Sequence, residues 1–405
     1  MRTMYLDLSV PKIIATRLLG KVLTAAYFGP TSPLRLATLP DPPLPADDWV
    51  RVTNRMCGIC GSDLHQLFVD ASLDVAPVAL PSHRRTFLGH EMVGEVVEAG
   101  PAVRDIGVGS RVVRWGRGDD CRARGRSDLC RPCANGHRVL CERASEESEF
   151  TLVGGGFGDS FIAPAGALLP VPDDLKDEQA IFVEPAAVAI HAAWRRPVEP
   201  GERVLIVGCG TIGYLLLQVV RSLQPDCEIV AVAQFPWQAE MAGRFGADHT
   251  FLSSDDGYAR TADFTGARLY EGRSDNRMLL GGFDVVFDVV GITSTLNNAL
   301  RWSRAGGTVV LVGVNLHRMK LDVTPVWYQE VDLKGTVGHD VVSWQGEEIS
   351  TFGLAMRWMR SGRLSCEPLL THRFPLEAYR QAFNAAVDKQ GSHSIKVAFD
   401  LQDTS

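Results

Sequence analysis

The sequence has no apolar run near the ~18 residues that a membrane span requires, so we expect no membrane partner. It also lacks basic excess, because 41 Lys and Arg stand against 48 Asp and Glu. Nucleic-acid-binding proteins usually carry a basic field, so we expect no nucleic-acid partner. The first residues lack the uninterrupted apolar block of a secretory signal, since Asp7, Lys12 and Arg17 break it. Nine cysteines without such a signal favour a reducing compartment, and we expect a cytoplasmic protein.

The composition is that of a globular protein with two or three domains. The chain has 405 residues, 45% of them apolar and 22% charged. Strands and helices alternate after residue 200, with elements predicted at 203–207, 212–223, 228–233 and 237–245. Such alternation predicts an α/β fold with a parallel, doubly wound sheet. The roles of segments 1–25 and 253–282 are not evident from the sequence.

A glycine-rich turn joins the strand at 203–207 to its helix. Gly208, Gly210 and Gly213 form G-x-G-x-x-G. The first glycine permits a tight turn, the second lets the backbone approach a pyrophosphate, and the third lets helix and strand pack closely. The helix N-terminus, with Thr211 and Ile212, would face the phosphates. This motif predicts a dinucleotide site; the alternative is a glycine-rich turn of another α/β fold.

The end of the second strand bears on which dinucleotide binds. An acidic residue ~20 positions beyond the glycines normally holds the adenosine ribose, but Ala233 and Gln234 stand there. Without a carboxylate there is no repulsion against a 2′-phosphate, yet no Arg or Lys beside the strand end attracts one. NAD and NADP both stay open, and the missing carboxylate favours NADP slightly.

Two groups of residues suit zinc. Cys60, His90 and Glu91 offer a thiolate, an imidazole and a carboxylate, and a catalytic zinc keeps an open position beside such ligands. Singly, each has a structural alternative, as a buried thiol or a core histidine. The second group is a set of four thiols within 21 residues, which suits a closed structural zinc site: Cys121, Cys130, Cys133 and Cys141. The alternative for this set is an ordered loop of reduced thiols without metal.

Taken in chain order, these motifs resemble the zinc-dependent medium-chain dehydrogenases, which include the alcohol, sorbitol, threonine and glucose dehydrogenases. The resemblance is carried by CGICGSDLH (57–65), GHEMVGEVVEAG (89–100), VEPAAVAIHA (183–192), GCGTIGYL (208–215) and PLLTHRFPLEAYRQAF (368–383). It implies a GroES-like, β-rich catalytic domain at 1–188 and 337–405. It also implies a Rossmann domain that binds NAD or NADP at 189–336.

The resemblance also implies roles for individual residues. Cys60 and His90 match ligands of the catalytic zinc, and Glu91 and Glu184 match carboxylates that can ligate it in the polyol and glucose dehydrogenase branches. Asp63 matches a carboxylate that orients the zinc histidine.

Further positions match the proton relay, the cofactor site and the structural zinc. Ser62 matches the hydroxyl that takes the substrate proton, and His65 matches the outer end of the relay. The nicotinamide is expected near Val312, Gly313 and Val314. We call the segment with the four clustered cysteines (121–141) the cysteine lobe. It departs from the family pattern at its first cysteine, because Cys121 lies nine residues before Cys130, whereas the family has a spacing of three residues.

The implied activity is the zinc- and NAD(P)-dependent interconversion of a secondary alcohol and its ketone. Glu91 and Glu184 point to the branch that acts on small polar substrates, such as polyols, sugars, cyclitols or hydroxy amino acids. Two alternatives stay open: an NAD- and zinc-containing lyase or epimerase with transient oxidation, and a catalytically silent dinucleotide-binding sensor. The resemblance also implies a homodimer or homotetramer.

Overall fold

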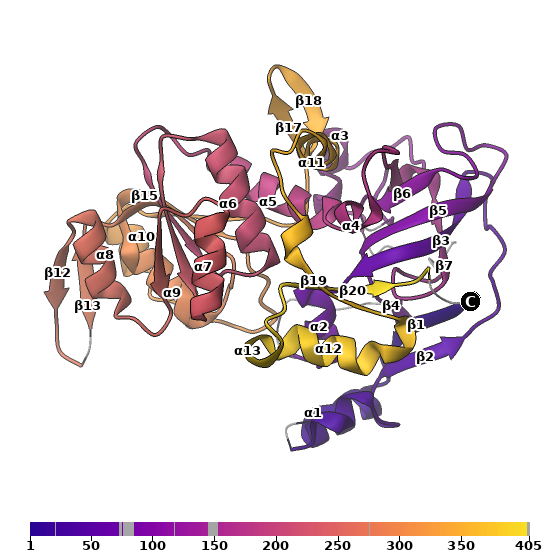
Figure 1. Cartoon of the computed structure of the whole chain (residues 1–405), viewed down its shortest axis with the longest axis horizontal. Coiled ribbons are helices and arrows are strands. Elements are labelled where there is room, and N and C mark those ends of the chain that lie inside the picture. Colours follow the sequence, from indigo (N-terminus) through magenta and orange to yellow (C-terminus); the bar gives the residue numbers. More distant parts are fainter. Residues whose placement is uncertain are drawn as a thin grey trace. The chain divides into compact units, whose positions relative to one another are not determined.

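The computed structural model describes residues 1–20, 22–72, 75, 85–116, 118–144, 153–274 and 276–402. The chain forms two compact units, Met1–Glu184 with His339–Ser405, and Pro185–Gly338 (Figure 1). The boundaries predicted from the resemblance fall after residues 188 and 336. Both units combine strands and helices, so the α/β prediction is confirmed. Among the described residues, no helix is long and apolar enough to cross a membrane.

The first unit is rich in strands. Its largest described sheet has the order β19-β20-β3-β5-β6-β8, with β7 also paired to β3, and a second sheet has the order β2-β1-β4. All pairs in these sheets are antiparallel except β19–β20. The strands are β1 (Arg2–Asp7), β2 (Leu34–Thr38), β3 (Trp49–Gly58), β4 (Arg85–Phe87), β5 (Glu91–Ala99), β6 (Arg111–Arg114), β7 (Ser160–Pro164), β8 (Leu168–Pro170), β17 (Val341–Trp344), β18 (Glu347–Ser350), β19 (Leu370–Phe374) and β20 (Lys396–Asp400).

Helices of the first unit are mostly short, and several are single turns. They are α1 (Val10–Gly20), η1 (Thr24–Phe28), α2 (Gly61–Leu67), α3 (Arg131–Ala134), η3 (Arg138–Leu140), η4 (Ala165–Ala167), α4 (Asp177–Ala180), α11 (Thr351–Arg360), η5 (Glu367–Leu369), η6 (Leu376–Ala378), α12 (Tyr379–Val387) and α13 (Lys389–Ser392). Helix α5 (Val183–Arg195) begins in the first unit and continues in the second.

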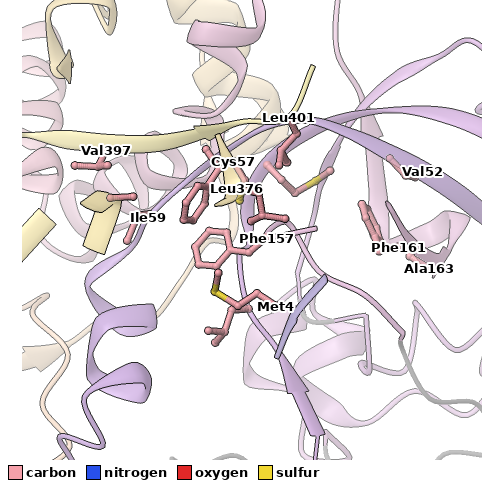
Figure 2. Close-up of a cluster of buried hydrophobic side chains, with 14 of the residues drawn as sticks. Met4, Val52, Cys57, Ile59, Phe157, Phe161, Ala163, Leu376, Val397 and Leu401 are labelled. Carbon is pink, nitrogen blue, oxygen red and sulfur yellow. The ribbon is translucent and has the colours of Figure 1, made fainter. Parts of the chain in front are cut away.

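The core of the first unit joins segments far apart in sequence. Met4 of β1, Cys57 of β3 and Phe157 are fully buried in one cluster, together with Val397 of β20 (Figure 2). Burial of such side chains contributes about 25 cal/mol per Å² of apolar surface. The N-terminal strand, the middle of the chain and its C-terminal strand therefore stabilise one another.

The second unit is a doubly wound parallel sheet. Its described strands follow the order β11-β10-β9-β14-β15-β16, and every neighbouring pair is parallel. Numbered along the chain this order is 3-2-1-4-5-6, the Rossmann arrangement. The elements are β9 (Arg203–Val207), α6 (Thr211–Leu223), β10 (Glu228–Ala233), α7 (Pro236–Arg244), β11 (His249–Leu252), α8 (Gly257–Thr265), β12 (Arg268–Glu271), β13 (Arg277–Leu280), β14 (Phe283–Asp288), α9 (Thr293–Trp302), β15 (Ser303–Leu311), α10 (Thr324–Tyr328) and β16 (Asp332–Gly335).

Burial explains why these strands are continuous apolar runs. Val204, Leu205 and Ile206 of β9 are all fully buried, because both faces of a parallel sheet are covered. The polar segment 253–282 contributes α8 and the antiparallel hairpin β12–β13.

Candidate active site and metal centres

The glycine loop of the second unit lies between β9 and α6, where the strand order reverses. Gly208 has φ of 110°, and a Cβ there would lie 2.7 Å from Val290 Cγ2. A Cβ on Gly213 would lie 1.9 Å from the Gly208 carbonyl oxygen. Thr211 begins α6, whose first N–H groups lack partners within the helix. The loop therefore lets a pyrophosphate approach the backbone closely at the N-terminus of α6, where the helix dipole is positive.

Asp288 organises the neighbouring loops at the carboxyl ends of β14 and β15. Its buried carboxylate accepts a hydrogen bond from Gly291 N at 2.9 Å, and its carbonyl oxygen accepts from Val312 N and Gly313 N, each at 2.9 Å. Val314, next in the chain, is exposed. Asp288 was not predicted from the sequence, although a charged residue that ends a buried parallel strand was a usable signal.

The loop after β10 contains no charged side chain that could bind the adenosine ribose or its 2′-phosphate. Ala233 is buried at the strand end, and Gln234 N and Phe235 N donate to Gln238 Oε1 at 3.1 and 3.2 Å. Arg244, further along α7, pairs with a glutamate one turn away. This geometry favours neither NAD nor NADP.

In the first unit, Asp63 ties Cys60 to the turn that carries His90. Cys60 is the N-cap of α2, and its N–H donates to Asp63 Oδ2 at 3.0 Å. Asp63 Oδ1 accepts from Gly89 N at 3.3 Å and lies 3.6 Å from His90 Nδ1. Burial lowers the pKa of His90, but Asp63 and the Cys60 sulfur outweigh it and raise that pKa well above its ordinary value. The predicted ligands Cys60 and His90 are therefore neighbours in an anionic site.

Glu91 forms a buried ion pair with Lys396. It begins β5, Lys396 begins β20, and both side chains are almost fully buried. Lys396 Nζ also donates to the Ile59 carbonyl oxygen at 3.1 Å. Burial lowers the pKa of Lys396, but Glu91 and the Cys60 sulfur raise it above its ordinary value, so the ammonium persists. Lys396 was not predicted from the sequence, where its only signal was a lysine within the mostly apolar strand segment SIKVAFD.

Glu184 adds a further acid to this cluster from the first turn of α5. Burial raises its pKa to about 7; His90 and Lys396 act to lower it, while Glu91 and Asp63 act to raise it. A group so strongly coupled to its neighbours by charge is a candidate functional group. The donor set of thiol, imidazole and carboxylate is one that zinc accepts.

Ser62 and His65 lie on the same short helix, α2. Residues three apart share a helix face. Ser62 is half-buried, while His65 reaches toward the surface and its Nδ1 lies 2.9 Å from Asp70 Oδ2. Ser62 and His65 therefore lie on one face of α2, with His65 in its last turn.

The four lobe cysteines converge more closely than the donors around Cys60. Their sulfur atoms all lie within 4.8 Å of one another, and all four residues are buried. Cys121 Sγ lies 3.7 Å and Cys130 Sγ 3.8 Å from Cys141 Sγ. A tetrahedral site with Zn–S bonds of ~2.3 Å places its sulfur atoms ~3.8 Å apart, so the cluster fits zinc. No other group this well converged occurs in the parts of the chain that the structure describes.

The unusual spacing of Cys121 is accommodated by Asp120. The Asp120 carboxylate accepts from Arg122 N at 3.0 Å and Ala123 N at 3.1 Å, which folds the segment into a turn. Arg138 pairs with the same carboxylate, and both side chains are buried. This turn brings Cys121 back to the other three thiols.

Comparisons with known proteins agree with this architecture. Residues 46–173 match the model for an alcohol dehydrogenase GroES-like domain, and residues 211–355 match the model for a zinc-binding dehydrogenase. An alcohol dehydrogenase that uses zinc and NAD or NADP is therefore the class that fold and site define.

Full-length relatives support the same class. The chain is 30% identical to L-idonate 5-dehydrogenase of Vitis vinifera over 87% of its own length and 88% of the relative. It is 28% identical to D-arabinitol dehydrogenase 1 of Uromyces fabae, over 93% of the chain and 97% of the relative. The crystal structure of L-idonate 5-dehydrogenase from Escherichia coli is 25% identical, with a TM-score of 0.68 over 87% of this chain and 91% of that one. The chain belongs to the zinc-dependent medium-chain dehydrogenases. These relatives are named as dehydrogenases, which disfavours the lyase, epimerase and silent-sensor alternatives.

Proposed function

We propose that this enzyme interconverts a small, polar secondary alcohol and its ketone, with a polyol, sugar, cyclitol or hydroxy amino acid as substrate. The observation that carries the proposal is the cluster of Cys60, His90 and Glu184 beside the Ser62–His65 helix. The names of two relatives, D-arabinitol and L-idonate dehydrogenases, support a polyhydroxylated substrate.

The first unit would carry catalysis and the second would bind the dinucleotide. We assign the catalytic zinc to Cys60, His90 and Glu184, and the structural zinc to the cysteine lobe. Glu91 is also a candidate ligand, but its carboxylate is engaged by Lys396, so we assign it to the surroundings of the metal. When bound, zinc acidifies a hydroxyl and the dinucleotide accepts hydride.

The chain's own residues would then handle the proton. Ser62 Oγ accepts the proton of the substrate hydroxyl, and His65 passes it toward solvent, since His65 is partly exposed and hydrogen-bonded to Asp70. Asp63, whose Oδ1 lies 3.6 Å from His90 Nδ1, would orient the imidazole and so set which ring nitrogen faces the metal.

We further propose a homodimer or homotetramer. Strand β16 is the outer strand of the described Rossmann sheet, and its Leu333 is exposed. Trp327 and Tyr328 of the adjoining α10 are also exposed. An open sheet edge with apolar neighbours is a surface that a second copy can cover. Light scattering on wild type and Leu333→Asp tests this: the variant should lower the mass, and an unchanged mass would count against β16.

A cytoplasmic location is also part of the proposal. None of the nine cysteines forms a disulfide, as expected in a reducing compartment. Detection of the protein in an oxidising compartment by fractionation would contradict it.

A substrate panel tests the activity. Purified holoenzyme is offered polyols, aldoses, cyclitols, threonine and simple primary alcohols, each with NAD and with NADP, and reduced cofactor is followed by absorbance. We expect turnover with a polyhydroxylated secondary alcohol and weak turnover with primary alcohols. Product formation without reduced cofactor would instead favour the lyase or epimerase alternative.

A further inference from the structure

Helix α1 turns an apolar face to solvent. Its residues Val10 and Leu18 are each 65% exposed, Ile14 is 52% and Leu19 50% exposed. By contrast, the polar residue Thr16 is fully buried, and its Oγ1 donates to the Thr31 carbonyl oxygen at 2.9 Å. A surface helix of a globular protein normally buries its apolar stripe. In α1 the arrangement is reversed, because the apolar side chains are exposed and a polar side chain is buried.

The exposed residues of α1 form one continuous arc. At roughly 100° per residue, Val10, Ile14, Leu18 and Leu19 span about half of the circumference, together with the small residues between them. The cations Lys12 and Arg17 fall at the two opposite edges of this arc. Beyond the helix, Val22 and Leu23 extend the patch and are also exposed. We call these six apolar residues the α1 patch.

The region around the α1 patch is basic in an otherwise acidic chain. From Leu8 to Pro40 the sequence has no Asp or Glu, although the whole chain has a formal charge of −7. This stretch contains Lys12, Arg17, Lys21 and Arg35. Lys12 pairs with Asp7, whereas the guanidinium of Arg35 donates to backbone carbonyl oxygens.

Helix α1 is anchored to the first unit through the neighbouring turn η1. Its neighbour η1 inserts aromatic rings into the first unit: the Tyr27 ring lies 4.8 Å from Phe68, and the Phe28 ring lies 6.4 Å from Phe383. Arg380 also donates to the Phe28 carbonyl oxygen at 3.2 Å. The segment that carries the α1 patch is therefore anchored to the first unit.

The chemistry of the α1 patch points to a lipid occupant. A second copy docked by two-fold symmetry would bring the basic 8–40 stretches of the two chains together, and like charges repel. The patch also lacks the Trp and Tyr side chains that dominate protein interfaces. An aliphatic arc with Arg17 at its edge, in a stretch of net positive charge, suits the boundary between acyl chains and anionic headgroups. We propose that α1 attaches this enzyme peripherally to an anionic phospholipid surface, contrary to the expectation from the sequence of no membrane partner.

Vesicle sedimentation of the full chain tests the proposal. The vesicles contain phosphatidylcholine alone or with phosphatidylserine, at low and high salt. Wild type should sediment with the phosphatidylserine vesicles at low salt and much less with the neutral ones. The variant Ile14→Gln/Leu18→Gln should bind at least about tenfold more weakly, because two aliphatic side chains no longer enter the apolar layer. Arg17→Gln should bind several-fold more weakly and show a weaker salt dependence.

The controls separate this role from folding and self-association. Val108→Gln changes another exposed aliphatic residue of the first unit and should bind like wild type. All variants should keep wild-type melting temperature and activity. The proposal fails if wild type does not bind, or if the double variant binds equally well. It also fails if light scattering shows that the double variant only dissociates an oligomer, which would make a second copy the occupant.

Discussion

The two candidate metal clusters of the first unit are assembled in opposite ways. The cysteine lobe takes all its donors from one segment of the chain, and all four donors are buried cysteines. The Cys60 cluster takes donors from α2, the turn before β5 and α5, and it contains a buried cation, Lys396. A closed, uniform site suits a structural role, whereas a mixed, charged site that has not fully converged keeps room for chemistry.

The largest effect on activity should come from removal of a donor from the Cys60 cluster. In the Cys60 cluster, His90→Ala should lower kcat/KM by more than about 10³-fold, since metal positioning and its electrostatic contribution are lost together. His372→Ala removes a histidine outside the cluster and should leave kcat/KM near wild type. Steady-state kinetics on both variants gives the answer, and substantial activity in His90→Ala would refute the assigned role.

The buried cation is the next feature to test. Lys396→Met should cost about 3–5 kcal/mol of unfolding free energy, because it leaves the Glu91 carboxylate buried without its partner. Glu91→Gln/Lys396→Met should recover part of that loss. Urea denaturation of the two single variants and the double variant measures the coupling. Additive losses would mean that the ion pair does not hold this cluster.

In the lobe, loss of one thiol should affect stability and spare chemistry. Cys133→Ala should lower the free energy of unfolding by about 3 kcal/mol, because the zinc that couples this loop to the fold is lost. Cys366→Ala, which removes a buried lone thiol, should cost about 1 kcal/mol. Turnover per folded molecule should stay near wild type in both. A selective loss of turnover in Cys133→Ala would contradict a structural role.

A smaller effect is expected from the proton relay. Ser62→Ala should lower kcat about 10²-fold while the zinc content is unchanged, because the hydroxyl that takes the proton is missing. Ser72→Ala removes a hydroxyl outside α2 and serves as the matched control. Equal kcat values in the two variants would remove Ser62 from the relay.

Local patterns predicted the second unit well. The strands expected at 203–207 and 228–233 agree with β9 and β10 to the residue, and Gly208 and Gly213 occupy backbone positions that only glycine suits. These features depend on hydrophobic runs and on sterics within a short stretch. Cys121 also lies beside the other three thiols of the lobe, because its turn is formed by the adjacent Asp120.

Features that depend on distant pairings were missed. Lys396 acquires its role only when β20 pairs with β3 and so meets Glu91, a contact separated by 305 residues. Asp288 gains its role when β15 lies beside β14. The apolar residues of α1 suggest a buried helix by composition, and the structure shows the reverse because Thr16 takes the inner face. Sequence periodicity does not reveal which face of a helix is covered.

Zinc stoichiometry tests the central claim most directly. Metal analysis of purified wild type, Cys60→Ala and Cys133→Ala, with kcat measured on the same samples, separates the two clusters. We predict two zinc ions per chain in wild type and one in each variant, with activity lost in Cys60→Ala and kept in Cys133→Ala. Two zinc ions in Cys60→Ala, or full activity in a Cys60→Ala protein with one, would contradict the account.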